Sequence, residues 1–193
     1  MSFENYTIVI TGLGGQGSIL LLQILGNTLM SQGYKVITSE THGLSQRGGN
    51  VTCFLRFGNK LSAPIPMMGS ADMIIALEES SILNALKYAK QDKSTKLVIS
   101  TYENPVRGME YPSIPSLLNK IYEYSDNLYF IPALEIVKKH IGNPKTMNII
   151  ILGYILRFLT IKRDVVEDSL KEFFSGKKLE INLKAFNEGY EIQ

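Results

Sequence analysis

The feature that most constrains the fold of this chain is a glycine-rich turn between two apolar segments. Residues 6–10 form a short apolar run that predicts a buried strand, and residues 19–30 are apolar over a length that predicts a helix. The intervening G-x-G-x-x-G pattern permits a tight turn, close approach of a ligand to the backbone, and close packing of helix and strand. The candidate binding-site residues of this turn are Gly12, Gly14, Gly15, Gln16 and Gly17.

A strand, a glycine turn and a helix in this order are typical of an anion site. The free N–H groups at the start of the helix, together with the helix dipole, favour a negatively charged group. The side-chain amide of Gln16 can add a hydrogen bond. A simpler interpretation is that a crossover from a buried strand needs glycines for packing alone. The pattern by itself leaves both interpretations open.

The composition is that of an ordinary globular protein and predicts one domain spanning residues 1–193. Of the 193 residues, 45% are hydrophobic and 20% are charged. The net charge of +2 and the even spread of the basic side chains give no reason to expect nucleic-acid binding.

Cysteine usage and hydropathy exclude several further classes. Cys53 is the only cysteine, which excludes an intrachain disulfide and an iron–sulfur site held by cysteines of this chain alone. The longest apolar stretch, residues 147–161, contains Asn148 and Arg157 and is shorter than the roughly 20 residues that span a bilayer. The start of the sequence has no pattern of a secretory signal, so we expect a cytoplasmic protein without a membrane segment.

The order of the predicted elements indicates an α/β fold. A strand at residues 35–38 completes a β-α-β unit with parallel strands, and residues 50–57 alternate as a strand that pairs antiparallel with residues 60–63. Further strands are predicted at residues 71–77, 96–100 and 128–131, and helices at residues 80–89, 116–122, 134–141, 147–159, 164–175 and 182–189. We therefore expect a Rossmann-like three-layer α/β/α fold with a mostly parallel mixed sheet and a helical C-terminal part.

A second candidate site is the polar segment at residues 39–50. It shows neither a helical nor a strand period and follows a strand, so we expect it beside the glycine turn at the carboxyl ends of adjacent strands. Arg47 offers a bidentate fork for a carboxylate or phosphate, His42 titrates near neutral pH, and Ser45 can donate a hydrogen bond. A structural loop whose arginine binds backbone carbonyls explains the segment equally well. The candidate residues of this segment are Glu40, His42, Ser45, Gln46, Arg47, Gly48 and Gly49.

Other chemistries fit the sequence less well. Glu40 lies near the place where an acidic residue holds the ribose of a dinucleotide, but no crossover helix follows it and little chain remains for a substrate domain. No G-x-S-x-G elbow surrounds Ser45, which argues against a serine hydrolase. Cys53 alternates with apolar residues and is expected to be a buried, inert thiol.

Two further groups of titratable residues receive structural interpretations. His140 lies late in a predicted helix and is expected to interact with the helix end rather than with a metal. Glu78 and Glu79 follow a predicted strand, so they either face a cleft or begin a solvated helix.

Taken together, the two motifs resemble the gamma-type domain of the 2-oxoacid:ferredoxin oxidoreductase family. The first is G-L-G-G-Q-G at residues 12–17, and the second is S-E-T-H-G-L-S-Q-R-G-G at residues 39–49. Within that family the chain looks most like the small (beta) subunit of indolepyruvate ferredoxin oxidoreductases. The further similar segments are A-D at residues 71–72, A-L-E at 76–78, Asn148 with L-G at 152–153, N-L-K-A-F at 182–186 and G-Y at 189–190.

The resemblance implies a subunit of a larger enzyme rather than a complete catalyst. Such enzymes oxidatively decarboxylate a 2-oxoacid, here an aryl 2-oxoacid, to an acyl-CoA and pass electrons to ferredoxin. It implies that thiamine diphosphate and iron–sulfur clusters lie on the large alpha subunit, that coenzyme A is a co-substrate, and that this chain alone binds no cofactor. The single cysteine and the absence of a G-D-G…N motif agree with that division.

The resemblance also suggests where the candidate residues act. The glycine turn and the Arg47 segment would form one face at the subunit junction, where they enclose the thiamine site or bind substrate or coenzyme A; no catalytic residue is assigned. Two alternatives stay open: loops that serve only to dock the large subunit, and a stand-alone NAD-binding Rossmann protein. The sequence also leaves open whether the isolated chain forms a homodimer.

Overall fold

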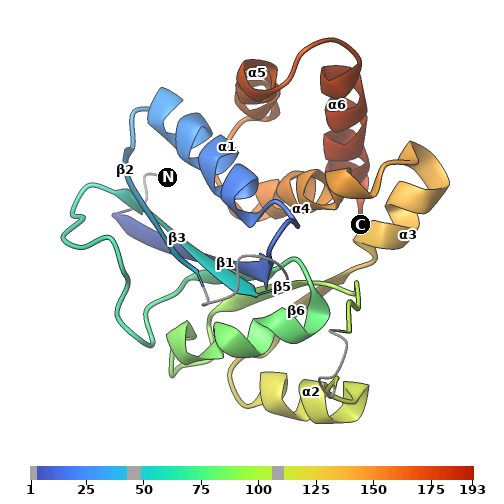
Figure 1. Ribbon diagram of the computed structural model, residues 1–193. Coiled ribbons are helices and arrows are strands. Elements are labelled where there is room, and N and C mark those ends of the chain that lie inside the picture. Colours follow the sequence, from blue (N-terminus) through green and yellow to red (C-terminus); the bar gives the residue numbers. More distant parts are fainter. Residues whose placement is uncertain (1–3, 43–48, 106–110) are drawn as a thin grey trace.

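The computed structural model describes residues 4–42, 49–105 and 111–193, and its centre is a mixed β-sheet (Figure 1). Within these residues the sheet has six strands. They are β1 (Asn5–Leu13), β2 (Lys35–His42), β3 (Asn50–Gly58), β4 (Met73–Ala76), β5 (Lys96–Ser100) and β6 (Asn127–Ile131).

The strand order is β2-β3-β1-β4-β5-β6. Strands β1, β4, β5 and β6 pair in parallel, whereas β3 pairs antiparallel with both of its neighbours, β1 and β2. Strands β1 and β2 therefore run in the same direction, as the β-α-β pattern predicts, but β3 lies between them. The predicted pairing of β3 with residues 60–63 is wrong, because that segment forms no strand.

Burial explains why β3 occupies an interior position. Cys53, Leu55 and Phe57 belong to the core on one face of the sheet, and Phe54 belongs to the core on the other face. A strand with buried side chains on both faces is favoured inside a sheet that is covered on both sides. Residues 60–63 carry a single leucine among small and charged residues and cannot bury a comparable surface.

Helices cover both faces of the sheet. The α-helices are α1 (Ser18–Ser31), α2 (Ile114–Tyr122), α3 (Ala133–Ile136), α4 (Met147–Ile155), α5 (Arg163–Phe173) and α6 (Gly176–Glu191). Shorter helical turns are η1 (Glu79–Asn84), η2 (Leu86–Tyr88), η3 (Val137–Ile141), η4 (Pro144–Thr146) and η5 (Leu156–Phe158). Helices α1, α4, α5 and α6 lie on one face, and η1, η2 and α2 lie on the other (Figure 1). This arrangement confirms the predicted three-layer α/β/α fold with a mostly parallel sheet and a helical C-terminal part.

Some boundaries differ from the predictions. Strand β2 continues to His42, so residues 39–42, predicted as loop, belong to the sheet. Residues 80–89 form η1 and η2 in place of one α-helix, and the buried Glu78, rather than a serine, caps the first of them. Helix α5 already begins at Arg163, so the capping box predicted at Asp164 does not form.

Helix α4 is apolar all round because it packs against α1, α3 and α6 as well as the sheet. Its residues from Asn148 to Ile155 are all buried. Within the described ranges, no helix combines the length and the hydropathy needed to cross a bilayer.

Candidate functional site

The glycine turn and the start of η1 lie at one edge of the sheet, where the adjacent strands β1 and β4 end. From β1 the chain passes to α1 on one face, whereas from β4 it passes to η1 on the other. A point where the chain diverges in this way is where open α/β sheets bind ligands. Thr11 joins the two strands here, since its carbonyl accepts from Leu77 N at 2.9 Å and its hydroxyl donates to the Ser81 carbonyl at 3.2 Å.

The turn itself needs its glycines. Gly15 and Gly17 have φ values of 94° and 85°, in the left-handed region that favours glycine. A Cβ on Gly12 would lie 2.8 Å from Gln16 Oε1 and would displace the Gln16 side chain from its present position. Gln16 Oε1 accepts from Leu13 N at 2.8 Å, so the side-chain oxygen of Gln16 holds the turn together and only its amide nitrogen remains.

Three buried polar atoms around the start of α1 have no hydrogen-bond partner among the residues that the structure describes. They are Gln16 Nε2, Ser18 Oγ and Asn148 Oδ1. Gly17 caps the helix without a side-chain hydrogen bond, and the first turn carries no acidic residue. Buried polar atoms almost always have a partner, and the exceptions cluster where water, an ion or a ligand completes the site. The arrangement therefore suits a polar or anionic group placed at this helix start.

The structure brings the two predicted site segments together at their ends. Gly14 N donates to the Gly49 carbonyl at 3.0 Å, so the end of the polar segment is hydrogen-bonded to the glycine turn. At its other end, His42 closes β2 opposite Val51 of β3. The candidates that lie outside the described residues are Ser45, Gln46, Arg47 and Gly48, and the side chain of His42 is likewise not described.

Glu40 does not occupy the position of a dinucleotide-binding carboxylate. It is exposed on β2 opposite Cys53, and β3 separates it from β1. The prediction that the two loops follow adjacent strands is therefore wrong. In the dinucleotide-binding fold the acidic strand is adjacent to the glycine-turn strand, whereas here two strand spacings, about 10 Å, lie between them. The geometry does not favour the stand-alone NAD-binding alternative.

Cys53 is buried as predicted, whereas His140 contacts a neighbouring helix and not, as predicted, the end of its own. The Cys53 side chain is fully buried, and burial, followed by the nearby Glu40 charge, raises the pKa of its thiol to about 12. Such a thiol stays protonated and unreactive at neutral pH. His140 Nδ1 lies 3.1 Å from Glu188 Oε1 on α6, so the ring contacts a carboxylate of a neighbouring helix.

Glu78 is neither solvated nor open to a cleft. Its carboxylate is fully buried and accepts hydrogen bonds from Ser80 Oγ and Ser81 N on one oxygen. The other oxygen accepts from the Tyr111 hydroxyl at 2.6 Å, and burial, followed by this hydrogen bond, raises the pKa of Tyr111. Glu78 therefore fixes the backbone where the chain leaves β4 and enters η1.

Sequence reasoning did not assign Ser18 and Asn148 to the glycine turn, although Asn148 is among the residues that carry the resemblance. Asn148 lies on α4, far along the chain, and its Nδ2 donates to the Gly17 carbonyl at 3.2 Å. A Cβ on Gly17 would come within 2.4 Å of that nitrogen, so the Asn148 side chain packs directly against Gly17 at the start of α1. A lone polar residue near the start of an otherwise apolar helix was the sequence signal that could have found it.

Comparison with known proteins agrees with this architecture. The family model "Pyruvate ferredoxin/flavodoxin oxidoreductase" matches residues 7–192. The chain is 31% identical to the indolepyruvate oxidoreductase subunit IorB of Archaeoglobus fulgidus, over 95% of this chain and 92% of that protein. It is 29% identical to the common subunit gamma of the pyruvate/ketoisovalerate oxidoreductases of Pyrococcus furiosus, over 93% of this chain and 92% of that one.

Solved structures share the fold at lower identity. The pyruvate oxidoreductase subunit PORC of Thermotoga maritima superposes with a TM-score of 0.73 at 17% identity, covering 98% of this chain and 97% of that chain. The 2-oxoglutarate:ferredoxin oxidoreductase of Magnetococcus marinus, solved with 2-oxoglutarate, coenzyme A and succinyl-CoA bound, gives 0.75 at 20% identity. That match covers 97% of this chain but 31% of the longer one, so this chain corresponds to one part of it. Because the family model matches nearly the whole chain and a relative is 31% identical along it, the chain belongs to the pyruvate ferredoxin/flavodoxin oxidoreductase family.

Proposed function

We propose that this chain is the small subunit of a 2-oxoacid:ferredoxin oxidoreductase that acts on an aryl 2-oxoacid such as indolepyruvate. The complex decarboxylates the oxoacid oxidatively, forms an acyl-CoA and passes electrons to ferredoxin. The similarity to small subunits along nearly the whole chain supports this assignment. The observation that carries it is the Gly14–Gly49 hydrogen bond, because it joins the two sequence motifs of the family at one sheet edge.

The residues of this chain do not fit the redox cofactors. Iron–sulfur clusters need several thiolates, whereas Cys53 is the only cysteine and its buried thiol has a raised pKa. Because the sequence also lacks a G-D-G…N motif for thiamine diphosphate, we assign that cofactor and the clusters to the large subunit, and this chain contributes binding and enclosure.

The edge that carries the glycine turn is the proposed contact with the large subunit and its substrates. The helix N–H groups of α1, with Ser18 and Asn148, suit a polar or anionic part of coenzyme A or of the oxoacid. Arg47 is the leading anion contact, and its polar neighbours in the same segment are His42, Ser45 and Gln46.

The test of this role compares assembly with turnover. Arg47→Ala is introduced into the complex, with Lys177→Ala, at an exposed position of α6, as a control for loss of one positive charge. We expect the variant to assemble with the large subunit but to lose at least tenfold in kcat/KM for the oxoacid or for coenzyme A, which corresponds to about 1.4 kcal/mol.

The alternative outcomes separate the competing roles. If Arg47→Ala no longer binds the large subunit while Lys177→Ala does, the segment is a docking element. Normal turnover with unchanged substrate and coenzyme A dependence contradicts both roles. The substrate class is tested separately, by assaying the native complex with a panel of 2-oxoacids and following ferredoxin reduction; activity of the isolated chain would overturn the subunit assignment.

A further inference from the structure

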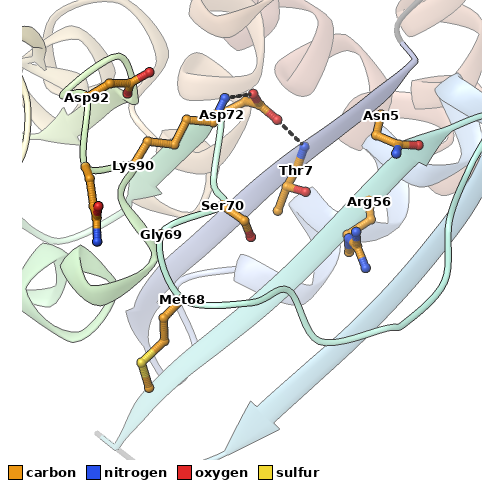
Figure 2. A pocket seen from close by; sticks show the side chains of 10 residues that line it. Asn5, Thr7, Arg56, Met68, Gly69, Ser70, Asp72, Lys90 and Asp92 are labelled. Atoms are coloured by element: carbon orange, nitrogen blue, oxygen red, sulfur yellow. Dashed lines mark hydrogen bonds and ion pairs between the residues drawn. The ribbon is translucent and has the colours of Figure 1, made fainter.

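A depression of about 650 Å³ opens at the edge of the sheet opposite the glycine turn (Figure 2). Asn5 and Thr7 lie at the start of β1, whereas the glycine turn follows its end. The depression is on the face that carries η1 and η2. It lies between the sheet and two chain segments, residues 68–72 before β4 and residues 90–92 before β5. Its lining residues are Asn5, Thr7, Arg56, Met68, Gly69, Ser70, Asp72, Lys90, Gln91 and Asp92.

Arg56 brings an uncompensated positive charge to this depression. It lies on β3 directly opposite Thr7, and its guanidinium donates to the Ala63 carbonyl. Its Nε is buried without a hydrogen-bond partner, and it forms no ion pair with the residues that the structure describes. A guanidinium is always charged at physiological pH. A carboxylate of another molecule would therefore stabilise this half-buried arginine.

Asp92 brings an exposed carboxylate, with the charge of Lys90 nearby, to the other side of the depression (Figure 2). Its Oδ1 accepts from Ser94 N at 3.0 Å and Ser94 Oγ at 2.7 Å, and these hydrogen bonds lower the pKa of the carboxyl. It makes no ion pair within the described part of the chain. Asp72 and Lys90, by contrast, neutralise each other at 2.5 Å, and Asp72 also accepts from Thr7 N at 2.8 Å.

An exposed apolar segment, here called the methionine rim, reaches the depression at Met68. Met67 and Met68 are 81% and 70% exposed, and nearby Ile65 is 52% exposed. All three belong to a segment without helix or strand between β3 and β4. Neighbouring exposed apolar side chains of this size mark interaction surfaces, and methionine and arginine are both enriched at protein interfaces.

We propose that a second copy of this chain docks here across a two-fold axis that passes through the depression. Arg56 of each copy then pairs with Asp92 of the other, and the methionine rim of each copy fills the depression of the other. A two-fold interface must be self-complementary, with residue i meeting j and j meeting i. This patch places a positive charge beside a negative one and a protruding rim beside a hollow. A small anion would satisfy Arg56 but would leave Asp92 and the apolar rim without a partner.

The proposed dimer does not rest on the proposed function, and it is compatible with it. The interface lies at the amino-terminal edge of the parallel strands, so each copy keeps its glycine turn free for another subunit. A dimer of small subunits would thereby join two large subunits into a symmetric assembly.

Charge reversal tests the proposal on the purified full-length chain by sedimentation equilibrium. We expect the unaltered chain to dimerise at concentrations up to roughly 100 μM, the range in which interfaces of micromolar affinity associate. Arg56→Glu and Asp92→Arg each place like charges across both contacts and should weaken the dimer at least tenfold. A 1:1 mixture of these two variants should dimerise again, because both contacts of the mixed pair join opposite charges. The double variant Arg56→Glu/Asp92→Arg should also recover.

Further variants keep the test decisive. Met67→Ser with Met68→Ser should weaken the dimer without changing charge, whereas Lys177→Glu, a charge reversal at an exposed position of α6, should leave it unchanged. Asp92 is exposed, so Asp92→Arg is informative even if Arg56→Glu folds poorly. A wild-type chain that stays monomeric over the whole range overturns the proposal. So does Asp92→Arg with wild-type affinity, or a mixture of folded single variants that shows no recovery.

Discussion

At the residue scale, Glu78 and Glu79 are adjacent and buried but have different environments. The Glu78 carboxylate accepts hydrogen bonds from Ser81 N, Ser80 Oγ and Tyr111, which replace the water that its oxygens lose on burial. Glu79 is 7% exposed, and burial, followed by the charges of Glu103 and Glu78, raises the pKa of its carboxyl. The surroundings therefore stabilise the charged form of Glu78 through hydrogen bonds and destabilise the charged form of Glu79.

Replacing Glu79 with glutamine should stabilise the protein at neutral pH. A carboxyl with a raised pKa in the folded state holds its proton more tightly there than in the unfolded state. Its favourable contribution is present at low pH and is lost as pH rises through the unfolded and then the folded pKa. Urea unfolding at several pH values should give Glu79→Gln a larger free energy of unfolding than wild type at pH 7. The difference should shrink towards about pH 4, near the pKa of the carboxyl in the unfolded state.

Glu78→Gln is the matched control, because it makes the same chemical change one residue earlier. The amide places an N–H₂ group against the donors that now point at Glu78, so we expect a loss of about 1–3 kcal/mol at pH 7. Equal effects of the two substitutions would show that the environments do not differ as described.

At the element scale, helices α4 and α6 touch backbone to backbone. Gly153 and Gly189 face each other across this contact, where a Cβ on Gly153 would lie 2.1 Å from the Phe186 carbonyl. A Cβ on Gly189 would lie 1.9 Å from the Ile150 carbonyl. Since the opposing atoms are backbone, no side-chain rotation can make room, and the two glycines set the separation of the helices.

Gly189→Ala should therefore force the two helices apart and cost about 1–3 kcal/mol of unfolding free energy. Gly26→Ala, in the interior of α1, is the control: its nearest heavy atom would be 3.7 Å away, so the higher helix propensity of alanine should stabilise by about 0.5–1 kcal/mol. Urea denaturation of both variants measures the contrast. Two changes of the same sign would contradict the close approach of α4 and α6.

Periodicity in the sequence located most elements but not their neighbours. The apolar run of β1, the alternation of β3 and the long apolar segment of α1 each carry a local signal, and the structure confirms all three. The interior position of β3 depends on side chains of other strands and helices that bury both of its faces, and no local pattern contains that information. The same limit applies to residues 80–89, where a buried carboxylate caps a 3₁₀-helix instead of a serine capping an α-helix.

The candidate site shows a similar division. The glycines at positions 12 and 17 and the return of the polar segment to the turn follow from motifs that are short in sequence. Asn148 joins the turn only because α4 packs over the start of α1, 131 positions along the chain from Gly17. A contact of that length is set by tertiary packing, so the sequence indicated the residue without indicating its partner.

At the scale of the whole molecule, the protection of the sheet is uneven. Strands β1 and β4 have neighbours on both edges and are buried, whereas β2 pairs only with β3 and is largely exposed or half-buried. We expect amides of β1 and β4 to exchange with solvent only on global unfolding, and those of β2 to exchange by local opening. Hydrogen–deuterium exchange followed by mass spectrometry measures this order; equal protection of β2 and β1 would contradict it.

The strand order has a consequence for synthesis on the ribosome. Residues 5–58 contain β1, α1, β2 and β3, which together form a contiguous three-stranded half of the sheet. The strands made afterwards, β4, β5 and β6, join the open side of β1 one after another, in the order in which they leave the exit tunnel. A nascent chain can therefore extend its sheet outward without separating two strands that have already paired.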